Sequence, residues 1–222
     1  MRIRRTSRAA PDAGSVSILT GLLLGAAAGA AGARLLRALG RGVRPPPLCC
    51  ASAVAVLWAV VAARLAGGAF GWWWAPVPLL LGWVGVLLAV CDLRAARLPD
   101  ALTLPAHPVA ACLVGLAAAH RPAALPGVLV GALLGAALFG GGYLVVRLLA
   151  PAALGPGDVK LAAPLGAVVG AVSVPAVLAV MGVAAVLTAL WSARRGGAGV
   201  PHGPAMLLPA WCATVFPPWW WT

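Results

Sequence analysis

Acidic residues are nearly absent from this 222-residue chain, which contains no glutamate and only four aspartates. Charged residues of both signs make up 9% of the sequence, whereas 63% of the residues are apolar. This composition lies outside the range of soluble globular proteins and is typical of a polytopic membrane protein. We therefore expect an all-α fold, a transmembrane helix bundle with six to eight spans. The aspartates are Asp12, Asp92, Asp100 and Asp158.

Basic residues are scattered through the sequence rather than gathered in one patch. Fifteen arginines and one lysine give a formal net charge of +12, and most of them lie between apolar runs. Nucleic-acid-binding proteins gather positive charge on one face, so this spacing argues against a nucleic-acid partner. The positive-inside rule, by which cytoplasmic loops of membrane proteins are rich in arginine and lysine, explains the pattern more simply.

Motifs for metal ions and cofactors are missing as well. The five cysteines form no C-x-x-C pair, and the three histidines lie in separate segments without a second ligand in register. We therefore predict neither a metal site nor a bound cofactor. These residues are Cys49, Cys50, Cys91, Cys112, Cys212, His107, His120 and His202.

Eight apolar stretches follow a basic tail at residues 1–14, which we expect to be disordered. Residues 15–222 are predicted to form one integral membrane domain. A helix needs about 20 residues to cross a bilayer, and the sixth and eighth stretches are short, which leaves six to eight spans. The stretches cover residues 15–33, 48–66, 70–90, 101–119, 125–149, 158–173, 175–193 and 204–219.

The loop charges predict which side of the membrane each loop faces. With loops on alternate sides, one side holds ten basic residues and the other holds only Arg64 and Arg121, so the first side is predicted to be cytoplasmic. An eight-span arrangement would place the basic tail on the opposite side, against the same rule. The N-terminal orientation therefore stays open.

Two of the aspartates lie at the ends of apolar stretches that meet on the predicted cytoplasmic face. Asp92 follows the third stretch, and Asp158 begins the sixth. Two carboxylates that share a site cannot both ionise cheaply, so one of them keeps a proton and the pair can act as acid and base together. We predict that Asp92 and Asp158 are a catalytic pair.

Each acid also has a structural interpretation. Asp92 could be a helix-end carboxylate that forms an ion pair with Arg94 or Arg97, and Asp158 could cap a helix, because an acid in the first turn complements the helix dipole. Asp100 is predicted to be a helix N-cap and is left out of the active site.

The residues beside Asp158 suit the close approach of an extended peptide. Gly155 and Gly157 permit backbone conformations and contacts that are closed to other residues, while Pro156 stiffens the turn. Lys160 is the only lysine in the chain. Its ammonium group could act on the acid pair or on a substrate, or it could simply extend to the membrane interface.

Three segments resemble one known family. Residues 92–105 and 155–163 are similar to the two aspartate motifs of the prepilin peptidase (type IV leader peptidase) family of GxGD-type intramembrane aspartyl proteases, and residues 200–205 resemble its Pro-aromatic-Gly-Pro segment. The resemblance covers about residues 80–215, which we take as the catalytic core. His202 stands where an aromatic residue is usual, so the resemblance predicts that His202→Phe is tolerated.

The resemblance implies an aspartic endopeptidase that removes short basic leader peptides from pilin-like precursors, either prepilins or pseudopilins. The cut is expected at the cytoplasmic face of the inner (plasma) membrane, with the precursor and the lipid bilayer as partners. Asp92 and Asp158 are the expected catalytic residues. The residues expected to receive the extended substrate are Gly155, Gly157, Lys160, Pro201, Gly203 and Pro204.

Bifunctional members of that family also methylate the new N-terminus through an insert after the first span, commonly with two C-x-x-C pairs. Here the corresponding place holds only residues 34–47, and Cys49 and Cys50 are adjacent. We therefore expect a short form without N-methyltransferase activity.

Two other functions remain compatible with the residues. A proton-coupled carrier could use Asp92 and Asp158 as a relay, although carriers more often have acids or broken helices at mid-membrane. An inactive scaffold for pilus assembly is the other alternative. Oligomeric state is not predicted.

Overall fold

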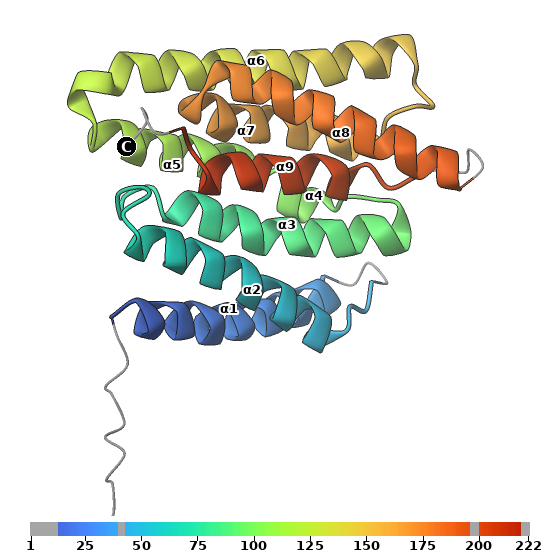
Figure 1. Cartoon of the computed structure of the whole chain (residues 1–222). Coiled ribbons are helices and arrows are strands. Elements are labelled where there is room, and N and C mark those ends of the chain that lie inside the picture. The colour runs from blue at the N-terminus through green and yellow to red at the C-terminus, as the bar shows by residue number, and fades with distance from the viewer. Residues whose placement is uncertain (1–12, 40–42, 196–199, 219–222) are drawn as a thin grey trace, which may run out of the picture.

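The structure, a computed structural model, describes residues 13–39, 43–195 and 200–218 (Figure 1). In these residues the regular secondary structure is entirely helical, which confirms the predicted all-α bundle. Nine α-helices follow one another: α1 (Ala13–Ala38), α2 (Pro47–Ala66), α3 (Pro76–Ala95), α4 (Asp100–Thr103), α5 (Ala106–Ala119), α6 (Leu125–Leu149), α7 (Pro156–Val172), α8 (Val174–Arg194) and α9 (Gly203–Val215).

Six helical segments of the described chain are long and apolar enough to cross a membrane. They match six of the eight predicted stretches, and the two short stretches correspond to α7 and α9. Residues 1–12 of the predicted basic tail lie outside the described residues, whereas Ala13 and Gly14 already belong to α1. The six segments are Gly14–Ala38, Pro47–Ala66, Pro76–Ala95, Asp100–Ala119, Pro122–Leu149 and Val174–Arg194.

The helix α3 extends beyond the end of the third apolar stretch. That stretch ends at residue 90, whereas α3 continues to Ala95, so Asp92 lies in the last turn of the helix, at the helix end predicted for it. Ala96 then ends α3 in the left-handed conformation, with φ of 47°. The apolar pattern stops there because Asp92, Arg94 and Arg97 are charged, while backbone hydrogen bonding continues the helix to Ala95.

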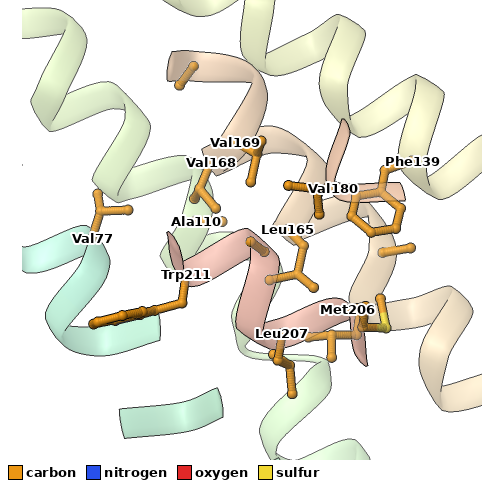
Figure 2. Packing of buried hydrophobic residues seen from close by; sticks show 14 of the residues in the cluster. Val77, Ala110, Phe139, Leu165, Val168, Val169, Val180, Met206, Leu207 and Trp211 are labelled. Carbon is orange, nitrogen blue, oxygen red and sulfur yellow. The ribbon is translucent and has the colours of Figure 1, made fainter. Parts of the chain in front are cut away.

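The short helices α7 and α9 lie in the middle of the bundle. In Figure 1, α6 forms one edge and the α1–α2 pair forms the opposite edge, with α7, α8, α9 and α3 between them. Eleven of the 17 residues of α7 are buried. Figure 2 shows Met206, Leu207 and Trp211 of α9 packed with Leu165, Val168 and Val169 of α7. A helix surrounded by protein does not need the full length of a bilayer, which explains why these two stretches are short.

The helix α9 is anchored to α3 by two tryptophan side chains. The Trp211 indole N–H donates to the carbonyl of Pro78 at 3.0 Å, and that of the buried Trp74 donates to the carbonyl of Thr214 at 2.8 Å. Both bonds satisfy a polar group inside an apolar bundle, where an unpaired group is costly. They fix the position of α9 along α3 and therefore also the place where α9 begins.

Glycines let α6 and α7 touch backbone to backbone. A Cβ atom built on Gly135 would lie 2.1 Å from the carbonyl oxygen of Gly166, and one built on Gly131 would lie 2.4 Å from that of Gly170. The glycine-rich first span packs on α2 in the same way, because a Cβ atom on Gly29 would lie 2.3 Å from the carbonyl of Cys50. The small residues of both spans thus serve close helix packing.

Candidate functional site

Asp92 is a buried carboxylate near the end of α3, with a relative exposure of 6%. Its Oδ2 atom accepts a hydrogen bond of 2.8 Å from the backbone N–H of Gly203, the first residue of α9. The predicted alternative, an ion pair of Asp92 with Arg94 or Arg97, is absent from the part of the chain that the structure describes. The guanidinium of Arg94 instead donates to the carbonyl of Arg44.

Asp158 lies in the first turn of α7 and is equally buried, with an exposure of 7%. Its Oδ2 atom accepts a 3.2 Å hydrogen bond from the N–H of Gly155, the N-cap residue, so the side chain does cap the helix as the structural interpretation proposed. Its Oδ1 atom is buried and has no hydrogen-bond partner among the described residues. The capping role therefore uses Oδ2 alone and does not involve Oδ1.

The ionised form of Asp158 is disfavoured. The residue lies in the first turn of α7, which is not one of the six long segments. Burial, with a smaller contribution from the charge of Asp92, raises its pKa to about 7, and the hydrogen bond from Gly155 acts in the opposite direction. Near neutral pH, Asp158 can therefore hold a proton within the protein.

Both acids face one cavity of about 490 Å³. The end of α1, the end of α3 with the loop after it, and the start of α7 form its walls. The two aspartates that were predicted as a pair from positions 66 residues apart in the sequence thus line the same space. The lining residues are Leu36, Leu39, Val43, Cys91, Asp92, Ala95, Ala96, Arg97, Leu98, Pro99, Asp100, Gly155, Pro156, Gly157, Asp158 and Lys160.

Each carboxylate is held against a glycine that has no room for a side chain. A Cβ atom on Gly155 would lie 2.8 Å from Oδ2 of Asp158, and a Cβ atom on Gly203 would lie 2.9 Å from Oδ2 of Asp92. The same two glycines donate the backbone hydrogen bonds. Both acids therefore lie at the N-terminus of a short helix, where the helix dipole favours negative charge.

Gly157 has a different neighbour. A Cβ atom at this position would lie 2.8 Å from Cβ of Leu98, in the loop between α3 and α4. The absence of a side chain therefore lets this loop lie directly on α7. The predicted role of Gly157 in substrate approach stays a prediction, and the structure adds a packing contact with Leu98 beside the cavity.

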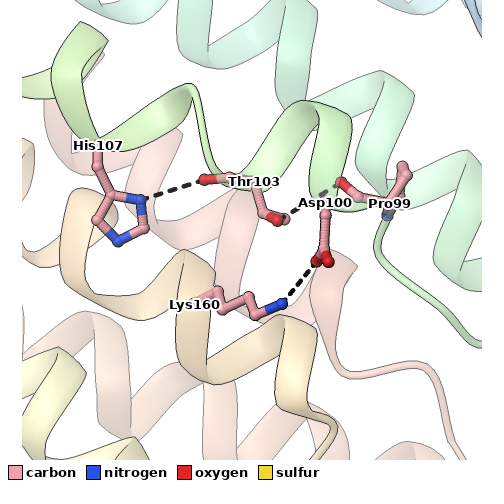
Figure 3. Close-up of polar contacts among 5 residues, drawn as sticks. All are labelled: Pro99, Asp100, Thr103, His107 and Lys160. Atoms are coloured by element: carbon pink, nitrogen blue, oxygen red, sulfur yellow. Dashed lines mark hydrogen bonds and ion pairs between the residues drawn. The ribbon is translucent and has the colours of Figure 1, made fainter.

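Lys160 forms an ion pair with Asp100, with 2.8 Å between Nζ and Oδ1 (Figure 3). The prediction that Asp100 is an N-cap is wrong by one residue, because Pro99 occupies that position and Asp100 is the first residue of α4. Figure 3 also shows His107 of α5 bonded through Nδ1 to the carbonyl of Thr103 at 3.2 Å, across the break between α4 and α5. The lysine thus ties α7 to the short helix that follows the Asp92 loop.

The predicted substrate residues fall into two groups. Gly155, Gly157 and Lys160 line the cavity. Pro201, Gly203 and Pro204 are not among the described residues that line it, although Gly203 reaches the site through its backbone N–H. Of these three residues, Gly203 therefore supports Asp92 directly.

Two side chains near the site were not predicted from the sequence. Tyr143 of α6 and Thr188 of α8 contact the two ring nitrogens of His202, at 2.7 Å and 2.6 Å. A signal was present, because Tyr143 is the only tyrosine in the chain and its hydroxyl lies in an apolar span.

Within the described residues, no three His, Cys, Asp or Glu side chains are grouped as metal ligands would be. The histidines have other contacts. His120, for example, stacks on Trp73 with 6.4 Å between ring centroids, and His202 takes part in the contacts just described.

Comparison with known families identifies the chain. The family model described as the type IV leader peptidase family matches residues 79–191, which run from α3 into α8 and include Asp92 and Asp158. Neither the search of curated proteins nor the search of solved structures gave a match. The matched segment covers just over half of the 222 residues. The chain therefore belongs to the type IV leader peptidase family.

Proposed function

We propose that this membrane peptidase is an aspartic endopeptidase in which Asp92 and Asp158 cleave short basic leader peptides from pilin-like precursors at the cytoplasmic face of the membrane. One observation carries the proposal. Two buried carboxylates from different helices line one cavity, each has one oxygen held by a glycine N–H, and Oδ1 of Asp158 is without a partner among the described residues.

The two acids have different roles in the reaction. Asp158 carries the proton on Oδ1 and donates it to the carbonyl oxygen of the scissile bond, while ionised Asp92 takes a proton from the attacking water. The resulting tetrahedral intermediate collapses when the proton held by Asp92 passes to the leaving nitrogen and the proton on the intermediate's oxygen returns to Asp158. The N–H of Gly203 and the start of α9 stabilise the charge on Asp92.

The charge distribution supports a cytoplasmic active site. The helices α1, α3, α6 and α8 each have an arginine in the last turn: Arg37, Arg94, Arg147 and Arg194. In Figure 1 these four helices end on the side of the bundle where α7 and α9 begin, which is also where α3 carries Asp92. Under the positive-inside rule this side faces the cytoplasm.

A leader peptide with an apolar helix after it suits this position. The helix can stay in the bilayer while the basic leader remains in water, so the scissile bond falls at the interface. The bond must be unwound to be cut, because a helix uses its carbonyls in internal hydrogen bonds. We propose that Gly155, Gly157 and Lys160, together with the segment of Pro201, Gly203 and Pro204, contact the extended strand.

We also propose that the chain has no N-methyltransferase activity. The first two helices are joined only by residues 39–46, because α1 ends at Ala38 and α2 begins at Pro47. This connection has no space for a further domain. Arg37, at the end of α1, bonds to this connection through the carbonyl of Pro45 at 3.5 Å.

Co-expression with a pilin-like precursor tests the function directly. Mass measurement of the precursor's N-terminus should show loss of the basic leader and an unmethylated new N-terminus. An intact precursor in the presence of the folded protein would contradict the peptidase proposal, and a mass increase of one methyl group would contradict the absence of methylation.

The pH dependence of cleavage follows from the proton on Asp158. Because the pKa of this carboxyl is raised to about 7, deprotonation removes the donor as the pH rises through that value. We expect the rate to fall about tenfold for each pH unit above the midpoint. Initial rates between pH 5 and 9, measured in lipid nanodiscs, check this. A rate that stays constant to pH 9 would show that Asp158 is not the proton donor.

A double substitution separates the two roles considered for Gly157. Gly157→Ala should lower the cleavage rate about tenfold or more, because the new methyl group meets Cβ of Leu98 and displaces the loop, and Leu98→Gly, which removes that Cβ atom, should restore much of the activity in the double variant. If the double variant is as slow as Gly157→Ala, the glycine serves substrate approach rather than loop packing. Leu98→Gly alone is the control.

A further inference from the structure

Three polar side chains meet at the start of α9, and none of them is among the described residues that line the cavity. His202, the N-cap residue of α9, places Nε2 2.7 Å from the hydroxyl of Tyr143 and Nδ1 2.6 Å from the hydroxyl of Thr188. Tyr143 belongs to α6 and Thr188 to α8, so one ring joins three helices. The Tyr143 side chain is buried at 8% exposure and also packs edge-to-face on Phe139.

The hydrogen atoms of this group can be assigned by counting donors. The Thr188 hydroxyl has a single hydrogen, and it donates this to the carbonyl of Ala184 at 2.8 Å. It can therefore only accept from the imidazole, so Nδ1 of His202 carries a proton. The lone pair on Nε2 then accepts from the Tyr143 hydroxyl. All three polar groups are satisfied only when the ring is neutral and protonated at Nδ1.

The electrostatic surroundings agree with a neutral ring. Burial lowers the pKa of His202 from its ordinary value. A charged imidazole would have to donate at both nitrogens, which would turn the Tyr143 hydroxyl into an acceptor and leave its hydrogen without this partner. The acids closest to the network are Asp158, whose charge acts on Tyr143, and Asp92, which is reached through Gly203.

The ring is connected to Asp92 through one peptide unit. His202 directly precedes Gly203, whose N–H donates to Oδ2 of Asp92 at 2.8 Å. The carbonyl of His202 accepts the N–H groups of Ala205 and Met206, at 3.0 Å and 3.2 Å, and so starts α9. The direction of the Gly203 N–H therefore depends on where the His202 backbone lies, and the side chain fixes that backbone to α6 and α8.

We propose that His202, held by Tyr143 and Thr188, is a positioning residue that keeps the Gly203 N–H aimed at Asp92. This inference rests on the proposed catalytic role of Asp92. The ring touches neither acid, so its effect is on the placement of the carboxylate and not on substrate affinity. Thr188→Val removes the hydroxyl at nearly constant volume and should lower kcat about 10- to 100-fold, with KM unchanged within about twofold.

The experiment uses the full-length protein in lipid nanodiscs with a purified pilin-like precursor. Thr188→Val and Tyr143→Phe should both lower kcat, while Thr188→Ser, which keeps the hydroxyl, should restore most of it. His202→Phe distinguishes two expectations. The family resemblance alone predicts normal cleavage, whereas the hydrogen-bond network predicts a lower kcat. If His202→Phe does not fold, the Thr188 pair decides the matter alone.

Thr20 provides a matched control on α1. Its hydroxyl donates to the carbonyl of Val16 at 2.9 Å, the same bond to the residue four positions earlier that Thr188 makes, but without a histidine. Thr20→Val should therefore leave kcat within about twofold of the parent protein. An equal fall in both valine variants would show that loss of a helix hydroxyl, rather than of the network, is responsible.

Nitrogen-15 NMR of histidine-labelled protein gives a second readout that does not depend on cleavage. The His202 signals, assigned by comparison with His202→Phe, should show protonation at Nδ1 only, and Thr188→Val should shift them toward the other tautomer. An Nε2-protonated or charged ring in the parent protein would overturn the proposal.

Substitution of Asp92 distinguishes the proposed catalytic pair from the positioning role of His202. If substitution of Asp92 leaves cleavage intact, the catalytic pair itself is wrong. If Asp92 is essential but Thr188→Val and Tyr143→Phe cleave with normal kcat, or change only KM, the pair stands and the positioning role of His202 is refuted.

Discussion

Asp158→Asn is expected to reduce leader cleavage by at least about 10³-fold, and Asp92→Asn by a similar factor. Asparagine preserves the shape of each side chain and can keep the contact of its oxygen with the glycine N–H. It can neither hold the transferable proton required of Asp158 nor accept one as Asp92 must. The loss therefore concerns the chemical step, and both variants should still fold and insert into the membrane.

The matched control is Asp100→Asn. This residue lies in the same cavity wall, but its ion pair with Lys160 is between side chains that are 46% and 40% exposed, and such pairs contribute about 0–1 kcal/mol. Cleavage should stay within about fivefold of the parent rate. Mass measurement of the precursor's N-terminus distinguishes the outcomes. Near-normal processing by either asparagine variant of the pair would end the aspartic assignment.

Gly135→Val is expected to cause the largest loss of stability. The Cβ atom would lie 2.1 Å from the carbonyl oxygen of Gly166 and 2.8 Å from Cα of Gly170. Both neighbours are backbone atoms of α7, which cannot turn aside as a side chain does, so the two helices must separate. Overpacking of this kind costs about 3 kcal/mol or more, which corresponds to a fall in the unfolding midpoint of roughly 10 °C.

The same helix supplies the control for that substitution. A Cβ atom on Gly141 would have nothing within 4 Å, so Gly141→Val adds the same side chain to the same helix in open space. Its midpoint should change by less than about 2 °C. Thermal unfolding in detergent, followed by circular dichroism or by aggregation, measures both. Equal effects would mean that valine disturbs α6 itself and that the α6–α7 contact is not responsible.

The spans and the acid pair could be predicted from the sequence because their signals are local. A run of about 20 apolar residues specifies a membrane helix without reference to the rest of the chain. Four acids in 222 residues leave few possible pairs, and the loop charges put Asp92 and Asp158 on one side. The predicted fold follows from these patterns and is confirmed.

The supporting contacts could not be predicted in this way, because they join distant parts of the chain. Lys160 bonds to a residue 60 positions earlier, and His202 to one 59 positions earlier. Which partner each meets depends on how α4, α6 and α8 pack around the short helices. Gly157 illustrates the same point, since its neighbour Leu98 is in contact only after the loop that follows α3 has folded onto α7.

The fit between each carboxylate and its glycine constrains how such a site can change by mutation. Any other residue at position 155 or 203 brings a carbon atom within 3 Å of the oxygen that the glycine N–H holds. A single substitution therefore disturbs the acid even when the acid itself is unchanged. Each aspartate and its glycine therefore constrain one another's substitution, although Asp92 and Gly203 are 111 positions apart in the sequence. Recombination between two diverged genes of this kind would therefore have to bring a compatible Asp92 and Gly203 together in one protein.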